Sequence, residues 1–128
     1  FPNFEAVIPK DNPNAAILPL DQFSDAIKRV SLFSSERSRG VKFTLEKNRM
    51  RLFSSNPELG EARDKLEIDY NGAPIEIGFN GQYVLEYMAT TGAEKIRLEL
   101  RDENSAALFR PEGDGEIKSL YVLMPMKI

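Results

Sequence analysis

Residues 20–33 read Leu20-Asp-Gln-Phe-Ser-Asp-Ala-Ile-Lys-Arg-Val-Ser-Leu-Phe33, and after a short polar stretch the chain continues Val41-Lys-Phe-Thr-Leu45. In the first stretch the apolar residues recur at spacings of three and four, which predicts an amphipathic helix of about three turns that begins near Asp21. In the second stretch they alternate, which predicts a half-buried strand. The change from a helical period to a strand period indicates an α+β fold in which a helix packs on a sheet.

Further segments extend the alternation into antiparallel pairs. Residues 46–48 have turn composition and residues 50–53 are again apolar in alternation, so we expect a hairpin. Residues 62–70 alternate up to Asn71-Gly72, a dipeptide typical of tight hairpin turns. We therefore expect residues 75–79 to form the returning strand.

A second helix is predicted after Asn80, which is a favoured N-cap residue. Apolar and aromatic residues within 83–88 follow at helical spacing, and Gly92 ends the pattern. Strands are then expected at residues 96–100, 108–109 and 120–124, and a loop is expected at residues 9–16, upstream of the first helix.

The order of these elements repeats along the chain. With the short apolar segment at Phe4, Val7 and Ile8 counted as the first strand, a strand, a helix and three strands precede residue 72, and the same series follows it. The sequence therefore predicts an internal βαβββ duplication, in an α+β fold with two helices packed on antiparallel sheet.

The composition restricts both size and chemistry. The 128 residues fit a single domain, 1–128, and the net charge of -3 gives no overall attraction to nucleic acid or to a membrane. The absence of cysteine and histidine removes thiolate chemistry, the usual general base and the commonest metal ligand. No apolar run approaches the roughly 20 residues of a membrane span. We expect no cofactor, no metal site and no membrane partner, and Phe1 in place of an initiating Met suggests a piece of a longer protein.

Glu58, Glu61 and Asp64 form the acidic cluster of the sequence. A pair of carboxylates can perform acid and base catalysis, as in a small hydrolase. No histidine, lysine or metal-ligand pattern accompanies the cluster, so a solvated or interface role is the alternative. No catalytic residue is assigned.

Lys28, Arg29, Arg37 and Arg39 gather on and just after the first predicted helix. Together they form a possible contact for a DNA backbone, although each also fits an ordinary solvated helix face. No stacking aromatic alternates with them, so a DNA contact would be independent of sequence and sensitive to salt.

The last eight residues, Tyr121-Val-Leu-Met-Pro-Met-Lys-Ile128, are unusually apolar for a chain end. Methionine is flexible and polarizable, and it is frequent on surfaces that accept several partners. This segment therefore predicts a binding surface.

Several motifs, spread along the whole chain, carry a resemblance to a known family. They are Phe1-Pro-Asn-Phe4, Glu36-Arg-Ser-Arg-Gly-Val41, Asn56-Pro-Glu58, Glu76-Ile-Gly-Phe-Asn80 with Tyr83-Val-Leu85, and Tyr121-Val-Leu-Met-Pro-Met126. In this order they resemble the third, C-terminal domain of the bacterial sliding clamp, the beta subunit of DNA polymerase III. The resemblance implies the DNA-clamp fold over residues 1–128, with residues 1–10 as the segment that leads in from a middle domain.

The resemblance also implies a function. In this family three such domains per chain pair head to tail into a homodimeric ring around duplex DNA. The implied protein is a non-catalytic processivity factor of DNA replication, located in the cytoplasm. It is an accessory subunit of DNA polymerase III. The DNA-directed DNA polymerase activity, which is a nucleotidyltransferase activity, belongs only to the whole complex. The implied partners are the DNA polymerase III catalytic subunit, the clamp loader, and other polymerases and repair proteins with motifs of the Gln-Leu-x-Leu-Phe kind. Duplex DNA is held non-specifically by the full ring.

Two sites are carried over by the resemblance. The client-peptide pocket comprises Pro2, Val7, Asn80, Tyr83, Val122, Leu123, Met124, Pro125, Met126, Lys127 and Ile128. The ring interface comprises Leu32, Phe33, Glu58, Glu61 and Asp64. The Met and Pro residues would give the pocket an apolar wall, while Asn80 and Tyr83 would supply hydrogen bonds. The alternative is that Tyr83 and Val122 fill the core, as these residue types often do.

Some positions depart from the common pattern of the family. Ala6, Ser38, Asn104 and Ala106 differ from the residues frequent there, so client preference is expected to differ. Gly60 and Arg63 stand where further acids are common, so the ring contact is expected to be weakened or rearranged. A free-standing peptide-binding module of clamp-like fold is the alternative interpretation, and a small hydrolase is the third.

Overall fold

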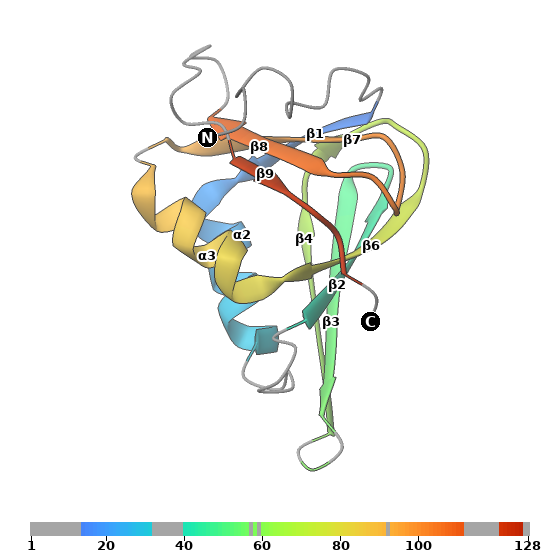
Figure 1. Cartoon of the computed structure of the whole chain (residues 1–128), viewed down its shortest axis with the longest axis vertical. Helices are drawn as coiled ribbons and strands as arrows, with labels where there is room; N and C mark the ends of the chain where they lie inside the picture. Colours follow the sequence, from blue (N-terminus) through green and yellow to red (C-terminus); the bar gives the residue numbers. More distant parts are fainter. Residues whose placement is uncertain are drawn as a thin grey trace.

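The computed structural model describes residues 14–31, 40–56, 58, 60–91, 93–111 and 121–126. Within this part of the chain the helices and strands alternate in two similar series (Figure 1). In chain order they are β1 (Asn14–Pro19), α2 (Leu20–Ser31), β2 (Gly40–Glu46), β3 (Arg49–Asn56), β4 (Gly60–Glu67), β5 (Asp69–Tyr70), β6 (Ile75–Asn80), α3 (Gly81–Thr90), β7 (Lys95–Leu100), β8 (Ala107–Pro111) and β9 (Tyr121–Leu123).

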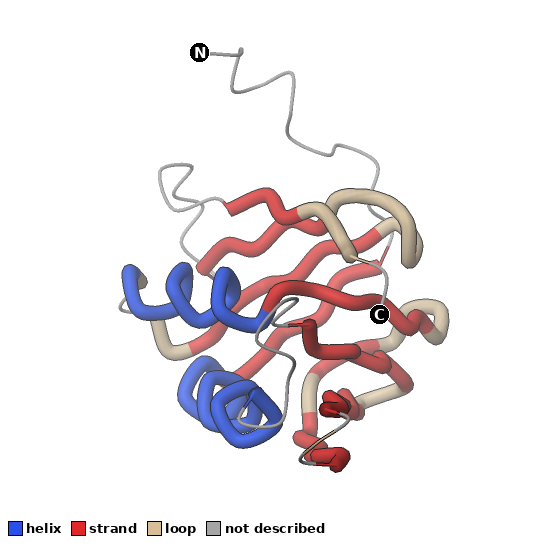
Figure 2. The backbone as a smooth tube through the Cα atoms, turned by 60° about the horizontal axis from the view of Figure 1, so that its bottom comes forward, coloured by secondary structure: helices blue, strands red, loops and turns tan. Residues whose placement is uncertain are grey.

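The strands form two antiparallel sheets. One has five strands in the order β5-β1-β7-β8-β9, and the other has four in the order β4-β3-β2-β6. The two helices lie beside each other, with strands of the five-stranded sheet above them and the four-stranded sheet next to them (Figure 1 and Figure 2). The expected α+β architecture, with two helices packed on antiparallel sheet, is confirmed.

The helix α2 follows from its apolar stripe. Phe23, Ala26, Ile27 and Val30 are buried, as their spacing of three and four residues requires. Asp21 lies in the first turn and Lys28 and Arg29 lie in the last turn. Charges of these signs at these ends interact favourably with the helix dipole and stabilise the helix. The predicted helix is confirmed over residues 20–31.

A chain of aromatic side chains runs through the core. Phe43 contacts Phe23 and Phe79 with ring centroids 5.9 and 5.7 Å apart, and Phe79 contacts Phe109 at 5.8 Å. All four rings are tilted or edge-on to one another, which is the arrangement that aromatic pairs favour. Because Phe23 and Phe43 belong to the first series of elements and Phe79 and Phe109 to the second, this contact chain joins the two halves.

The predicted order of elements is present, but its first strand is β1, whereas the apolar segment counted as that strand, residues 4–8, lies outside the described residues. The first series is β1, α2, β2, β3 and β4, and the second is β6, α3, β7, β8 and β9, with the two-residue strand β5 between them. The hairpin predicted from residue 41 to residue 53 is also present as β2 and β3.

Two local predictions are wrong. Residues 14–16, assigned to a loop, begin β1, which pairs with both β5 and β7. The strands on either side of Asn71-Gly72 do not form a hairpin, because β5 pairs with β1 whereas β6 pairs with β2 in the other sheet. This dipeptide therefore joins two sheets, and it does not turn within one.

Candidate functional site

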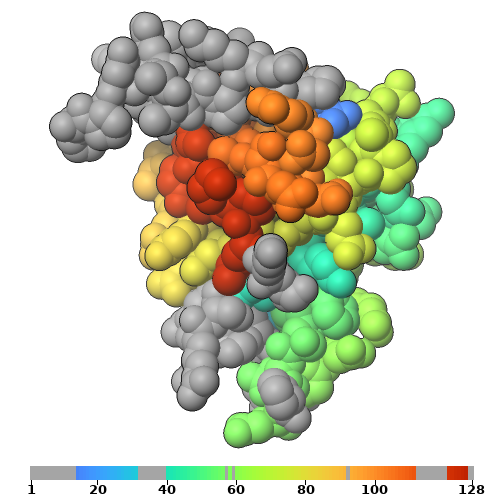
Figure 3. Space-filling view, turned by 45° about the vertical axis from the view of Figure 1, so that its right-hand side comes forward, coloured from blue at the N-terminus to red at the C-terminus, as the bar shows by residue number. Residues whose placement is uncertain are grey.

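The last described residues, 124–126, link the two sheets. β9 pairs with β8, and the chain then leaves the five-stranded sheet. The backbone N–H of Met126 donates to the carbonyl oxygen of Gly78 at 2.8 Å, and Gly78 lies in β6, at the edge of the four-stranded sheet. Figure 3 shows the C-terminal atoms, in red, at the surface beside the orange strand region and the yellow helix region. The segment 124–126, called the C-terminal tail below, is thus attached to the domain while remaining accessible.

The start of α3 is fixed by Asn80. Its side-chain oxygen accepts hydrogen bonds from the backbone N–H groups of Gln82 at 2.9 Å and Tyr83 at 3.3 Å. Asn80 has extended backbone angles, with φ -71° and ψ 109°, as an N-cap residue requires. The N-cap predicted from the sequence is confirmed, and the cap orients the first turn of α3, which carries Tyr83.

Two stacked tyrosines lie between α3 and the C-terminal strand. The rings of Tyr87 and Tyr121 have centroids 5.2 Å apart and planes 6° from parallel. Burial raises the pKa of Tyr87 to about 12. Burial also raises the pKa of Tyr121, and the nearby Glu86 and Tyr83 add to the effect. The sequence did not predict this stack, although Tyr121 is the first residue of the apolar C-terminal segment that predicted a binding surface.

The described members of the predicted pocket differ in their exposure. Tyr83 is 48% exposed and Met124 65% exposed, and these are the exposed large hydrophobic residues of the described part. Val122 is partly exposed, whereas Leu123 is 9% exposed and belongs to the core. The alternative that Tyr83 fills the core is therefore wrong. Pro2, Val7, Lys127 and Ile128 lie outside the described residues, as do Ala6 and Ser38.

The acidic residues predicted for the ring interface do not form one cluster. β4 is an edge strand of its sheet, and Glu61 lies near Arg63 on it at 3.4 Å. Asp64 points to the other side of the strand, where its carboxylate binds Arg29 of α2 at 2.5 Å. Glu58 lies exposed in the turn before β4. Leu32 and Phe33 lie outside the described residues.

The cations predicted to contact DNA are only partly described. Lys28 and Arg29 are exposed in the last turn of α2, off its apolar stripe as expected. Arg29 is held by Asp64, so two residues predicted for different partners contact each other. Arg37 and Arg39 lie outside the described residues.

The described residues offer little for catalysis. In the ranges that the structure covers, no group of three or more acidic, histidine or cysteine side chains could hold a metal ion. Hydrogen bonds from the backbone of Asn104 and the side chain of Ser105 lower the pKa of Asp102, which identifies this carboxylate as a turn-forming group. Among the described helices, none has the length and apolar character needed to cross a membrane.

Comparison with known proteins gives one consistent result. The family model described as DNA polymerase III beta subunit, C-terminal domain, matches residues 5–127. The chain is 35% identical to the beta sliding clamp of Pseudomonas aeruginosa, 38% to that of Caulobacter vibrioides and 33% to that of Escherichia coli strain K12. Each alignment covers 100% of this chain and 34% of the relative, so the chain spans about a third of the length of these relatives.

Solved structures agree with the sequence relatives. The crystal structure of a DNA polymerase sliding clamp from Pseudomonas aeruginosa superimposes with a TM-score of 0.94 at 34% identity, over 100% of this chain and 35% of that chain. The DNA polymerase III beta subunit from Thermotoga maritima superimposes with a TM-score of 0.93 at 29% identity, over 100% of this chain and 34% of that chain. The similarity therefore extends over the whole chain in both sequence and structure.

Proposed function

We infer the function from one premise: the chain belongs to the family of DNA polymerase III beta subunits, the beta sliding clamps, and corresponds to their C-terminal domain. We propose that it acts within a non-catalytic processivity factor of DNA replication. In the complete protein, a ring of such domains surrounds duplex DNA and tethers polymerases and repair proteins to it. This domain contributes the C-terminal part of the client-peptide pocket and one side of the ring contact.

The client site is carried by one observation, the exposure of Tyr83 at the start of α3 and of Met124 in the C-terminal tail, which is hydrogen-bonded to Gly78, two residues before the N-cap Asn80. Large apolar side chains exposed together often mark a binding surface. The N-cap of α3 and the hydrogen bond from Met126 to Gly78 hold these two elements before a ligand arrives. A preformed surface loses less conformational entropy on binding, which favours affinity.

The proposed ligand is a short motif of the Gln-Leu-x-Leu-Phe kind. Its leucine and phenylalanine would pack against Met124 and Tyr83, and each fully buried side chain contributes roughly 1.5–3 kcal/mol before ordering costs. Pro2, Val7, Lys127 and Ile128 complete the proposed pocket. The proposed clients are the polymerase catalytic subunit, the clamp loader, and other polymerases and repair proteins.

The proposed ring contact uses the free edge of β4. An edge strand presents unpaired backbone N–H and C=O groups, which can pair with a strand of another chain. Glu58 and Glu61 lie exposed along this edge, where they can face cations of the partner, and Leu32 and Phe33 complete the proposed contact. We assign duplex DNA to the helix side, through Lys28, Arg29, Arg37 and Arg39, and the protein to the cytoplasm.

An NMR titration tests the client site. The labelled chain is titrated with the peptide Gln-Leu-Ser-Leu-Phe and with a version in which both leucines and the phenylalanine are alanine. We expect shifts at Asn80, Tyr83 and residues 122–126 with the first peptide only. Met124→Ser should weaken binding by about five- to tenfold, because it removes part of the apolar surface.

Gln22→Ser is the matched control, because Gln22 is exposed on the other helix, α2. This variant should bind as the parent chain does. The titration is repeated with the two preceding domains of the Pseudomonas aeruginosa relative joined upstream. The proposal is wrong if neither the chain nor this fusion shows the localised shifts.

A further inference from the structure

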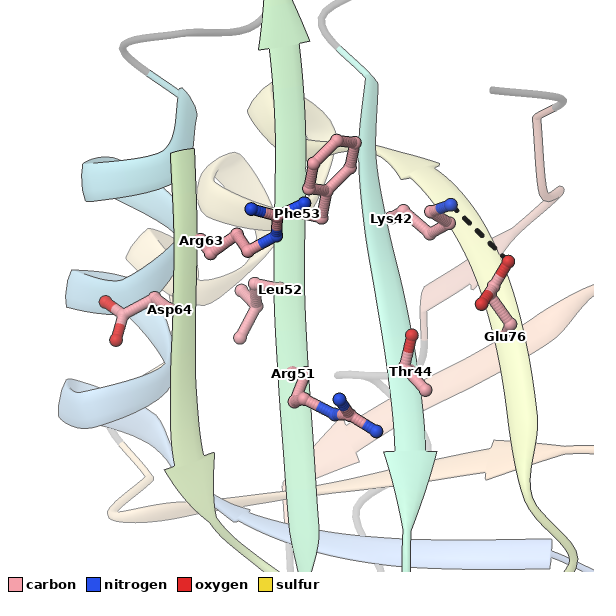
Figure 4. Close-up of a pocket in the computed structure, with 8 residues that line it drawn as sticks. All are labelled: Lys42, Thr44, Arg51, Leu52, Phe53, Arg63, Asp64 and Glu76. Carbon is pink, nitrogen blue, oxygen red and sulfur yellow. Dashed lines mark ion pairs between the residues drawn. The ribbon is translucent and has the colours of Figure 1, made fainter. Parts of the chain in front are cut away.

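The outer face of the four-stranded sheet carries an aromatic side chain between two cations. In the strand register Phe53 lies opposite Lys42 of β2 on one side and Arg63 of β4 on the other. The Lys42 ammonium is 5.3 Å from the centroid of the Phe53 ring, and the Arg63 guanidinium carbon is 5.1 Å from it. These residues line a groove of about 310 Å³, shown in Figure 4. We call it the Phe53 groove.

The two cations beside Phe53 are loosely held by the carboxylates near them. Lys42 lies 3.5 Å from Glu76, and Arg63 lies 3.4 Å from Glu61. Charge-assisted hydrogen bonds between such groups are normally about 2.7–2.9 Å long. The Arg63 side chain is 72% exposed. An incoming carboxylate can therefore displace these weak partners at little cost.

The Phe53 groove continues toward the C-terminal tail. A second groove of about 330 Å³ is lined by Met126, Asn104 and Glu103, and it shares Lys42 and Glu76 with the first. The tail is hydrogen-bonded to β6, and β6, β2 and β3 follow one another in the sheet. Adjacent strands are about 4.8 Å apart, so Phe53 lies about 14 Å from the tail. An extended peptide covers this distance with about four residues.

We propose that the Phe53 groove is a second docking site for clients, which binds an acidic and apolar segment located about four residues from the client motif. The inference rests on the proposed function, because it extends the proposed client pocket across the sheet. A carboxylate of the segment takes the place of Glu76 on Lys42, and a second one binds Arg63. A leucine or another apolar side chain between them packs on the ring of Phe53.

A peptide fits the charges of this face better than a nucleic acid does. The Phe53 groove is lined by Glu76 and Asp64 as well as by its cations, and the adjoining groove adds Glu103, so a phosphate backbone would meet carboxylates along the path. Asp64 also borders the groove, but its carboxylate points away from Phe53 (Figure 4) and binds Arg29 of α2. A short acidic segment needs only the two cations beside the ring.

The test compares five fluorescent peptides, in three sets, by anisotropy. The first is Gln-Leu-Ser-Leu-Phe alone. The second set has two peptides, in which Glu-Leu-Glu is joined through a Gly-Ser-Gly-Ser linker to the N-terminus or to the C-terminus of this short peptide. The third set carries Gln-Leu-Gln in place of Glu-Leu-Glu. We expect one of the acidic peptides to bind about fivefold more tightly than its Gln-Leu-Gln counterpart, as exposed ion pairs and cation-aromatic contacts allow.

The variants Arg63→Gln and Phe53→Ser should remove this advantage without changing the affinity for the short peptide. Arg49→Gln is the matched control, because Arg49 lies on the same face of β3 but outside the groove. It should retain the full advantage. Circular dichroism of each variant checks that the fold is preserved.

Three results would overturn the inference. The first is equal affinity of the acidic and neutral extended peptides when the short peptide binds. The second is an advantage that survives Arg63→Gln, and the third is tighter binding of a thymidine decamer than of either acidic peptide, weakened by the same variants. If the short peptide fails to bind both the chain and its fusion to the two upstream domains, the proposed client pocket is refuted and the inference falls with it.

Discussion

Replacing Asn80 by alanine should destabilise the domain by a predictable amount. The Asn80 side chain satisfies the backbone N–H groups of Gln82 and Tyr83, which have no partner within α3. Loss of such a cap costs about 1 kcal/mol of unfolding free energy. For 128 residues the entropy of unfolding near 60 °C is about 270 cal/mol/K, so Asn80→Ala should lower Tm by about 4 °C.

The variant Asn80→Asp separates capping from peptide binding. Aspartate keeps an acceptor oxygen for Gln82 and Tyr83 and places a negative charge at the positive end of the helix, so Tm should stay at or above the parent value. It lacks the amide donor that the proposed pocket offers to a client. We therefore expect Asn80→Asp to bind the Gln-Leu-Ser-Leu-Phe peptide more weakly while retaining its stability.

Thermal unfolding by circular dichroism and the peptide titration measure the two effects on the same samples. A Tm for Asn80→Ala that equals the parent value would refute the capping argument. So would a fall in Tm for Asn80→Asp as large as that for Asn80→Ala. Unchanged peptide affinity in Asn80→Asp would remove Asn80 from the list of groups that bind the client.

Three further predictions concern the core and its titrating groups. Ser54 is fully buried, and its hydroxyl donates to the carbonyl oxygen of Val30. Ser54→Ala leaves that carbonyl unpaired, so it should lower the free energy of unfolding, measured in urea, by about 1–3 kcal/mol. A decrease below about 0.5 kcal/mol would contradict this prediction. A Cβ atom at Gly72 would lie 2.5 Å from the side-chain oxygen of Asn14, so Gly72→Ala should lower Tm by several degrees, whereas the double variant with Asn14→Ser should recover part of the loss. Burial raises the pKa of Tyr87 to about 12, above the value of about 10 in the unfolded chain, so the folded state retains a proton that the unfolded state releases. The stability due to Tyr87 is therefore present below pH 10 and is lost as the pH rises toward 12, and the fall in the urea midpoint over this window should be smaller in Tyr87→Phe.

Local signals in the sequence identify the elements whose stability is local. The spacing of apolar residues in α2 is strong enough to define the helix without its neighbours, and its buried stripe is the predicted one. Asn80 shows the same principle, because an N-cap acts on residues only two and three positions ahead. The apolar C-terminal segment and the resemblance to sliding clamps predicted a site at this end of the chain, whereas the exposure of Tyr83 has no local signal in the sequence.

The errors occur where distant parts of the chain determine the structure. β1 is flanked by β5 and β7, which lie far away in the sequence, while its own residues are partly turn formers such as Asn14. Asn14 is buried there because its side chain bonds to the backbone of Arg101 and Ala73. Position 72 requires glycine because the side chains of Asn14 and Tyr70 approach it closely. The glycine is therefore explained by crowding between distant segments and not by a hairpin turn.

The ion pair between Arg29 and Asp64 shows how tertiary contacts change the meaning of an exposed charge. The sequence places both residues on polar surfaces, but only the register of β4, where Asp64 lies opposite Leu52, shows that its carboxylate faces α2. In the proposed ring, a DNA phosphate would compete with Asp64 for Arg29, and a cation of the next subunit would compete with Arg29 for Asp64. A surface pair of this kind contributes about 0.5 kcal/mol, so it blocks neither contact. The ion pair does couple the DNA contact at Arg29 to the ring contact at Asp64, because binding at one of these residues releases the other. By thermodynamic linkage, each contact therefore favours the other by the same small free energy.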